Sequence, residues 1–223
     1  MLLELNQLIV KAGHQLLIKD ISWSAYKCIL AELGGDVYDG LCLRTSRMSY
    51  SQGMLEIMAP LPEHEVAKVI IGDLVKVLLE DLDLEFWSLG STTFNQESMD
   101  AGIEPDDCFY IQNEARIRGK DRINLETDPP PDLAIEIDIT SRTRFNNYQA
   151  LRVPELWRWN GSKLEINVLF DGKYIESNTS SIFPNLQIYQ LIPEYLMLSK
   201  INGRNATMKA FRTWIRQQIS SPI

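Results

Sequence analysis

The chain has 223 residues, of which 45% are hydrophobic and 23% are charged, and its formal net charge is −8. This length is enough to bury a substantial core, and the composition is that of an ordinary globular protein, so we expect a single domain over residues 1–223. The acidic balance argues against a general polyanion binder, because such proteins usually carry a basic surface.

The cysteines and the apolar segments indicate the cellular compartment in which the protein is expected. Cys28, Cys42 and Cys108 show no C-x-x-C spacing, so neither a disulfide framework nor a zinc cluster is expected. The opening segment contains Glu4 and Lys11 and lacks a small-residue cleavage site, which argues against a signal peptide. No window approaches about 18 uninterrupted apolar residues, so we expect no membrane span and a cytoplasmic location.

The first part of the chain predicts a helix and a hairpin. A helix is expected over 22–35, between serine N-caps and a pair of glycines that end it. A hairpin is expected over 47–58, with its turn at Gln52-Gly53.

The strongest helical pattern covers residues 60–82, where Pro62 stands at the helix start and apolar residues recur at helical spacing. Strands are then expected over 84–94 and 105–111, and a third over 132–140. The segment 116–131 is expected to be a loop.

The last part of the chain predicts a short helix over 145–156, then a three-strand meander over 156–177 with Asn-Gly and Asp-Gly turns, and a final helix over 205–219. The order helix, hairpin, helix and then several strands indicates a mixed α/β or α+β domain.

The strand over 132–140 alternates strictly between two faces. One face carries Leu133, Ile135, Ile137 and Ile139, and the other carries Ala134, Glu136, Asp138 and Thr140. The apolar face is expected in the core. Acids are depleted in strands, so the opposite face either meets water or uses its carboxylates to hold a ligand.

A second acidic strand begins with Asp106 and Asp107, 30 residues before Glu136. If the two strands pair, Asp106 can approach Glu136 across the sheet, and adjacent carboxylates repel unless a positive charge lies between them. Mg²⁺ and Mn²⁺ favour oxygen ligands of this kind. The alternatives are that Asp106 or Asp107 is a turn acid after Pro105 and that the acids of the later strand are solvated.

Three residues near these acids have competing interpretations. Glu65, in the first turn of the helix over 60–82, could reach the same site or could only favour the positive helix N-terminus. His64, next to Glu65 in the first turn, could support the site as a partner of its ligands, but we expect it on the surface. Tyr148 could face the site, but we expect it to pack in the core.

Other candidate features carry less chemistry. Two histidines support neither a zinc site nor a Ser-His-Asp triad, and the glycine-rich nucleotide-binding signatures are absent. Trp157 and Trp159 are expected in the core or an interface. Lys209, Arg212 and Arg216 form a basic stripe on the last helix, which is either a solvated face or a contact to a nucleic-acid backbone.

Three segments together resemble one known family. The sequence EPDD at 104–107, then PPPDLAIEIDITSRT at 129–143 and ALRVPELWRW at 150–159, is similar to the Uma-two family of restriction-endonuclease-like proteins in the PD-(D/E)XK nuclease superfamily. The likeness covers roughly residues 22–195. It implies a restriction-endonuclease-like α/β core, with a central mixed β-sheet flanked by helices and, in this chain, an added antiparallel meander.

The resemblance also implies residue roles. Asp106 matches the first motif acid and Glu136 the second, which makes both metal ligands, while Glu65 matches an auxiliary helix glutamate. Asp132 belongs to a second Pro-Asp pair, for which we expect a structural role. The implied reaction is phosphodiester hydrolysis at a bound Mg²⁺ or Mn²⁺.

The chain departs from the motif at one position. Asp138 stands where the motif has a lysine, and it becomes a possible further metal ligand. Arg144 or Arg142 is the nearest replacement cation, and Lys68 is a second substitute; arginine stays protonated and is a poor general base.

The leading hypothesis is therefore a metal-dependent DNA endonuclease in which Arg144 replaces the lysine, acting as a C2 homodimer. The alternative is a non-catalytic protein with the nuclease fold, which binds nucleic acid or a protein partner and has lost the catalytic lysine.

Overall fold

The computed structural model describes residues 10–34, 47–139 and 145–220. Its strands are β1 (Gln15–Ile18), β2 (Arg47–Ser51), β3 (Met54–Met58), β4 (Trp87–Ser88), β5 (Phe94–Gln96), β6 (Ala101–Ile103), β7 (Asp107–Tyr110), β8 (Leu133–Ile137), β9 (Glu155–Trp159), β10 (Leu164–Phe170) and β11 (Lys173–Ser177). Its helices are α1 (Trp23–Gly34), α2 (Pro62–Asp81), the 3₁₀ turn η2 (Glu97–Met99), α3 (Glu114–Ile117), α4 (Phe145–Ala150), α5 (Ile188–Asn202) and α6 (Arg204–Ser220).

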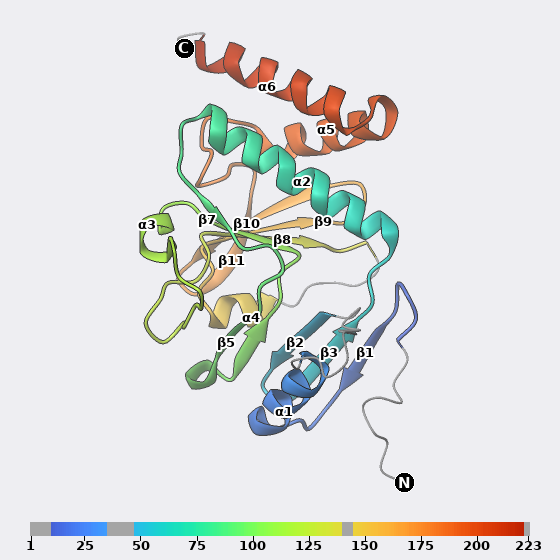
Figure 1. Cartoon of the computed structure of the whole chain (residues 1–223), viewed down its shortest axis with the longest axis vertical. Coiled ribbons are helices and arrows are strands. Elements are labelled where there is room, and N and C mark those ends of the chain that lie inside the picture. Colours follow the sequence, from blue (N-terminus) through green and yellow to red (C-terminus); the bar gives the residue numbers. More distant parts are fainter. Residues whose placement is uncertain (1–9, 35–46, 140–144, 221–223) are drawn as a thin grey trace.

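The central sheet has six strands in the order β11-β10-β9-β8-β7-β4. Only β8 and β9 are parallel, because α4 lies between them along the chain, whereas the other neighbours pair antiparallel. Helices α2 and α5 cover one face of this sheet, and α6 lies on the outer side of these two helices (Figure 1). The predicted central mixed sheet flanked by helices is confirmed, and the predicted meander, β9 to β11, is continuous with it.

The second sheet is antiparallel, with the order β1-β3-β2-β6-β5, and it lies on the side of the central sheet opposite α2 (Figure 1). Its two faces differ. Met48, Tyr50, Leu55 and Ile57 are buried in a cluster that includes Tyr26 of α1. The residues that alternate with them face the central sheet, so β2 and β3 place polar side chains between the two sheets.

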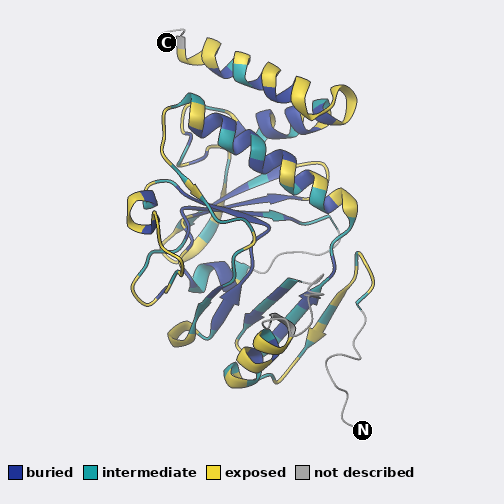
Figure 2. Cartoon of the chain, in the orientation of Figure 1, coloured by how far each residue is buried: buried dark blue, intermediate teal, exposed yellow. Residues whose placement is uncertain are grey.

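Strand β8 is buried on both sides, as Figure 2 shows for the centre of the molecule. Leu133, Ile135 and Ile137 belong to a buried cluster that also contains apolar residues of α2, α5 and α6, which confirms the predicted core face. Ala134, on the opposite face, packs with a separate cluster that includes Tyr148 of α4. The face of β8 that carries Glu136 is therefore covered by other side chains of the protein. Glu136 lies near the end of the strand, at the edge of this packed region.

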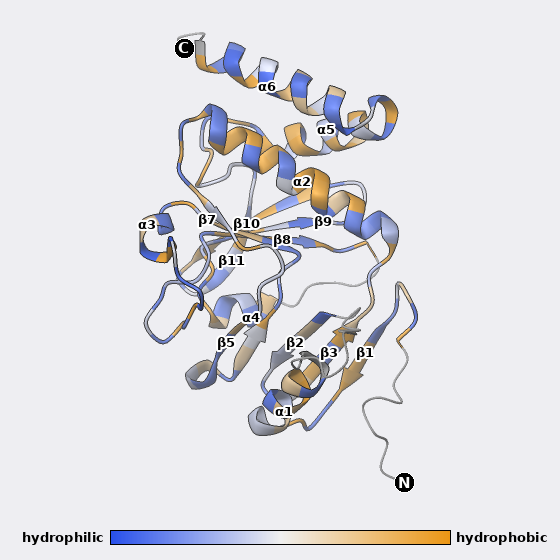
Figure 3. Cartoon of the chain, viewed as in Figure 1, coloured by the Kyte–Doolittle hydropathy of each residue, from blue (hydrophilic) through white to orange (hydrophobic). Residues whose placement is uncertain are grey.

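Helix α6 packs on α2, and both apolar and hydrophilic residues occur along it (Figure 3). Phe211 and Ile215 are buried. Arg212 and Arg216 form ion pairs of 3.3 and 2.7 Å with Asp81 of α2. Two residues of the predicted basic stripe are thus already neutralised within the protein.

Two sequence predictions need correction. The single strand expected over 84–94 is divided into β4 and β5, which belong to different sheets, because the chain bends at Gly90 with a φ of 57°. Helix α5 was not predicted, since Pro193 lies inside it and proline usually ends a helix. Within the described ranges, no helix has the length and apolar character needed to cross a membrane.

Helix α2 approaches β7 closely at Gly72. A Cβ atom at this position would lie 2.4 Å from Oδ2 of Asp107. The Asp107 side chain is buried, and its other oxygen, Oδ1, accepts a hydrogen bond from the amide of Cys108. We expect Gly72→Ala to lower the free energy of unfolding by about 1–2 kcal/mol, although alanine normally favours a helix by about 1 kcal/mol over glycine.

The same substitution made in an Asp107→Ala background should raise stability, because the obstructing carboxylate is gone. Urea denaturation of the four proteins of this double-mutant cycle measures the coupling. An equal effect of Gly72→Ala in both backgrounds would contradict the close approach.

Candidate active site between the two sheets

Asp106 lies immediately before β7, beside Glu136 of the neighbouring strand β8. Strands β7 and β8 pair antiparallel with Asp107 opposite Ile135, so the predicted pairing of the two acidic strands is observed. Oδ2 of Asp106 accepts a hydrogen bond of 2.6 Å from the amide of Ile137, and the side chain is 1% exposed. The backbone of β8 thereby fixes the orientation of this buried carboxylate.

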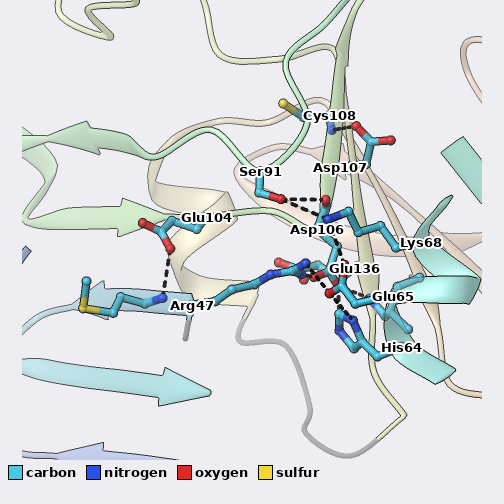
Figure 4. A network of polar contacts seen from close by, with 12 residues as sticks. Arg47, His64, Glu65, Lys68, Ser91, Glu104, Asp106, Asp107, Cys108 and Glu136 are labelled. Carbon is cyan, nitrogen blue, oxygen red and sulfur yellow. Dashed lines mark hydrogen bonds and ion pairs between the residues drawn. The ribbon is translucent and has the colours of Figure 1, made fainter. Parts of the chain in front are cut away.

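Arg47 of β2 supplies the cation at this carboxylate. Its Nη1 forms an ion pair with Oδ1 of Asp106, and its Nη2 lies 2.9 Å from Oε1 of Glu65. Figure 4 shows the side chain extending from the second sheet to the point where Asp106, Glu65 and Glu136 gather. Arg47 was not among the site residues predicted from the sequence, because it precedes the family motifs and only the folding of the second sheet brings it here.

His64 is completely buried, so its predicted surface position is wrong. It precedes Ala67, Ile71 and Leu74 at helical spacing and therefore belongs to the buried stripe of α2. Its Nε2 lies 3.2 Å from Oδ2 of Asp106. Burial lowers the pKa of His64 to about 4, and the nearby positive charge of the arginine adds to this effect.

Glu65 follows His64 in α2, and its side chain is 42% exposed. Burial opposes its ionisation, but Arg47 and Lys68 lower the pKa of Glu65 below its usual value. Lys68 lies 3.2 Å from Oε2 of Glu65 and 3.3 Å from Oγ of Ser91, whose hydroxyl donates to the carbonyl oxygen of Asp106 at 3.3 Å. The first turns of α2 therefore bring one acid and a second cation to the site.

Glu136 of β8 receives a hydrogen bond from the hydroxyl of Tyr148. Burial raises the pKa of Glu136 to about 8, which the Tyr148 hydrogen bond partly offsets and the charge of Asp138 reinforces. Tyr148 is buried in the core as expected, but its hydroxyl group also reaches the site.

Asp138 is held by Arg158 of β9, which lies beside Glu136 in the parallel register. Nε of Arg158 donates to Oδ2 of Asp138 at 2.7 Å, and Nη2 contacts the same oxygen. Nη1 of Arg158 lies 3.2 Å from Glu165. At the position of the motif lysine the protein thus has an acid whose charge an internal arginine neutralises.

Asp132 has the structural surroundings that its place at the start of the strand predicts. Its carboxylate accepts hydrogen bonds from the amides of Ile111 and Asn113 at 2.7 and 2.9 Å, and from the side chain of Asn113 at 2.6 Å. It connects the end of β7 to the start of β8 and lies outside the acid cluster.

A partly open cavity of about 60 Å³ separates the two sheets at this point, which is room for a few water molecules. Its lining is acidic and comes from both sheets and from α4. The side chains are Arg47, Met48, Ser49, Glu56, Met58, Ile103, Glu104, Glu136, Ile137, Asp138 and Tyr148.

The donor chemistry fits a hard divalent cation. Within the described part of the chain, no three His, Cys, Asp or Glu side chains are arranged to hold a metal ion. Asp106 nevertheless supplies a buried carboxylate and Glu136 a half-buried one, the ligand type that Mg²⁺ and Mn²⁺ favour, and Oδ1 of Asp106 already binds a positive group. Arg144 and Arg142, the predicted replacement cations, lie outside the described residues.

The buried His64 makes stability depend on pH. Its folded pKa of about 4 lies below the ordinary value of 6.5, so the unfolded chain binds more protons between these two pH values and stability falls as the pH drops through this window. From pH 7 to pH 4 we expect the wild type to lose on the order of 2 kcal/mol more than His64→Gln. Urea denaturation in EDTA measures the difference, and parallel stability curves would contradict this assignment.

One family of known proteins matches most of this chain. A family model described as "Uma2: Putative restriction endonuclease" matches residues 36–199. No curated protein matches the chain. A crystal structure of "a putative nuclease belonging to DUF820 from Anabaena variabilis ATCC 29413" is similar, with a TM-score of 0.45 and 14% identity, over 67% of this chain and 90% of that one. Because the family model spans most of the sequence, the chain belongs to the Uma2 family of restriction-endonuclease-like proteins.

Proposed function

We propose that this protein is a divalent-metal-dependent nuclease that hydrolyses phosphodiester bonds of DNA at Asp106 and Glu136. One observation carries the proposal: the buried Asp106 and the half-buried Glu136, which come from paired strands, lie together where an arginine from another sheet already compensates negative charge. Membership of a family described as restriction endonucleases supports the choice of reaction.

In this proposal Asp106 and Glu136 hold Mg²⁺ or Mn²⁺. The bound metal would polarise a phosphoryl oxygen and lower the pKa of a water molecule. The protein's own contribution is to fix both ligands, because the amide of Ile137 orients Asp106 and the hydroxyl of Tyr148 orients Glu136.

The remaining charged groups have secondary roles. Lys68 lies beside Glu65 and can attract a phosphate and stabilise the charge that develops on it. Glu65, with its lowered pKa, is ionised at neutral pH and serves as an auxiliary ligand or as a base that orients water.

Two further assignments carry over from the motif. Arg144 remains the proposed replacement for the lysine. Arg158 already compensates the charge of Asp138. Asp138 is therefore a further metal ligand only if the metal replaces Arg158 as its partner.

A symmetric dimer is part of the proposal. Cleavage of both strands of a duplex requires two sites related by the pseudo-twofold axis of DNA, which a C2 homodimer of this chain provides.

The direct test is cleavage of supercoiled plasmid and linear DNA with Mg²⁺ and with Mn²⁺. We expect Asp106→Asn and Glu136→Gln each to reduce the cleavage rate by at least about a hundredfold, because each replaces a carboxyl ligand of the metal with an amide of the same size. Glu176→Gln is the matched control, since this exposed acid on β11 pairs with Lys163 on the surface.

Cleavage that persists in both site variants would refute the assignment of the site. Absence of metal-dependent cleavage by the wild type, with DNA binding retained, would favour the second candidate function, a non-catalytic DNA-binding protein. The Asp138–Arg158 ion pair at the position of the motif lysine is the observation that favours this alternative.

A further inference from the structure

We infer that Arg47 is an internal cation that occupies the metal position at Asp106, and that a divalent metal binds by displacing its guanidinium group. This inference rests on the proposed function, because it concerns how the same site takes up its metal.

The contacts of Asp106 leave one oxygen for a cation. Oδ2 accepts the 2.6 Å hydrogen bond from Ile137 and faces Nε2 of His64 at 3.2 Å. Oδ1 makes neither of these contacts and instead meets Nη1 of Arg47. A metal ligated by Oδ1 and the guanidinium would therefore compete for the same place, and their like charges would repel.

The surroundings permit the exchange. When Arg47 leaves, Glu65 keeps a positive partner, because Lys68 lies 3.2 Å from its other oxygen. The cavity between the sheets borders both Arg47 and Glu136, so the long side chain has adjacent space lined by the acids Glu56 and Glu104. Arginine does not lose its proton at any pH near neutrality, so movement is the only way this positive charge can leave the site.

The exchange predicts that Arg47 weakens metal binding by the free protein. Isothermal titration of Mn²⁺ into the full chain, without DNA, should show about tenfold tighter binding by Arg47→Gln than by the wild type, since the variant has no charge to displace. Arg212→Gln is the matched control, because it removes an arginine from a comparable ion pair of 2.7 Å with Glu80, away from the site. Its affinity for Mn²⁺ should equal that of the wild type.

The outcomes separate the inference from the proposed function. If Arg47→Gln binds Mn²⁺ with equal or lower affinity, and Asp106→Asn abolishes binding, the displacement is refuted while the metal site stands. If neither the wild type nor Arg47→Gln binds Mn²⁺, both the displacement and the metal-dependent function are refuted.

A measurement on the unaltered chain covers the case in which Arg47→Gln does not fold. The side-chain Nε–H signal of Arg47 in NMR should exchange faster with water as Mg²⁺ is added. The signal of Arg216, whose Nε donates to Asp81 at 2.7 Å away from the site, provides the internal reference and should not change. Saturation with Mg²⁺ that leaves the Arg47 signal unchanged would overturn the inference.

Discussion

The ion pair between Arg47 and Asp106 connects the two sheets at the candidate site. Asp106 is 1% exposed, and a buried carboxylate without a partner is costly, so the position of the second sheet and the ionisation of this acid depend on each other. The same contact brings β2 close enough for Glu65 to share the guanidinium. The pocket then forms where the polar faces of the two sheets meet.

This arrangement follows from strands that have different neighbours on their two faces. In β8 the apolar face packs under α2, while Glu136 on the other face reaches the pocket. In β2, Tyr50 packs on α1, while Arg47 and Ser49 point toward the central sheet. Each strand thus contributes to a core and to the site at once, and a register shift of one residue would exchange the two roles.

Local patterns in the sequence were sufficient to predict the elements that carry the acids. Alternation predicted β8, and helical spacing predicted α2. The cation could not be predicted in this way: Arg47 lies 59 residues before Asp106, and no periodicity records which side chain a separate sheet brings to the site. His64 was misplaced for a related reason, since a polar residue on a buried stripe is identified only when its partner is known.

We propose that Asp106 and Glu136 form a metal site that Arg47 occupies until the metal enters. The most direct measurement is a crystal structure of the protein soaked with Mn²⁺, with anomalous scattering data to locate the ion. We expect an anomalous peak about 2.2 Å from carboxylate oxygens of both acids, with the Arg47 guanidinium moved away from Oδ1 of Asp106. A map with no peak between the two acids, and with Arg47 still paired to Asp106 at saturating Mn²⁺, would contradict it.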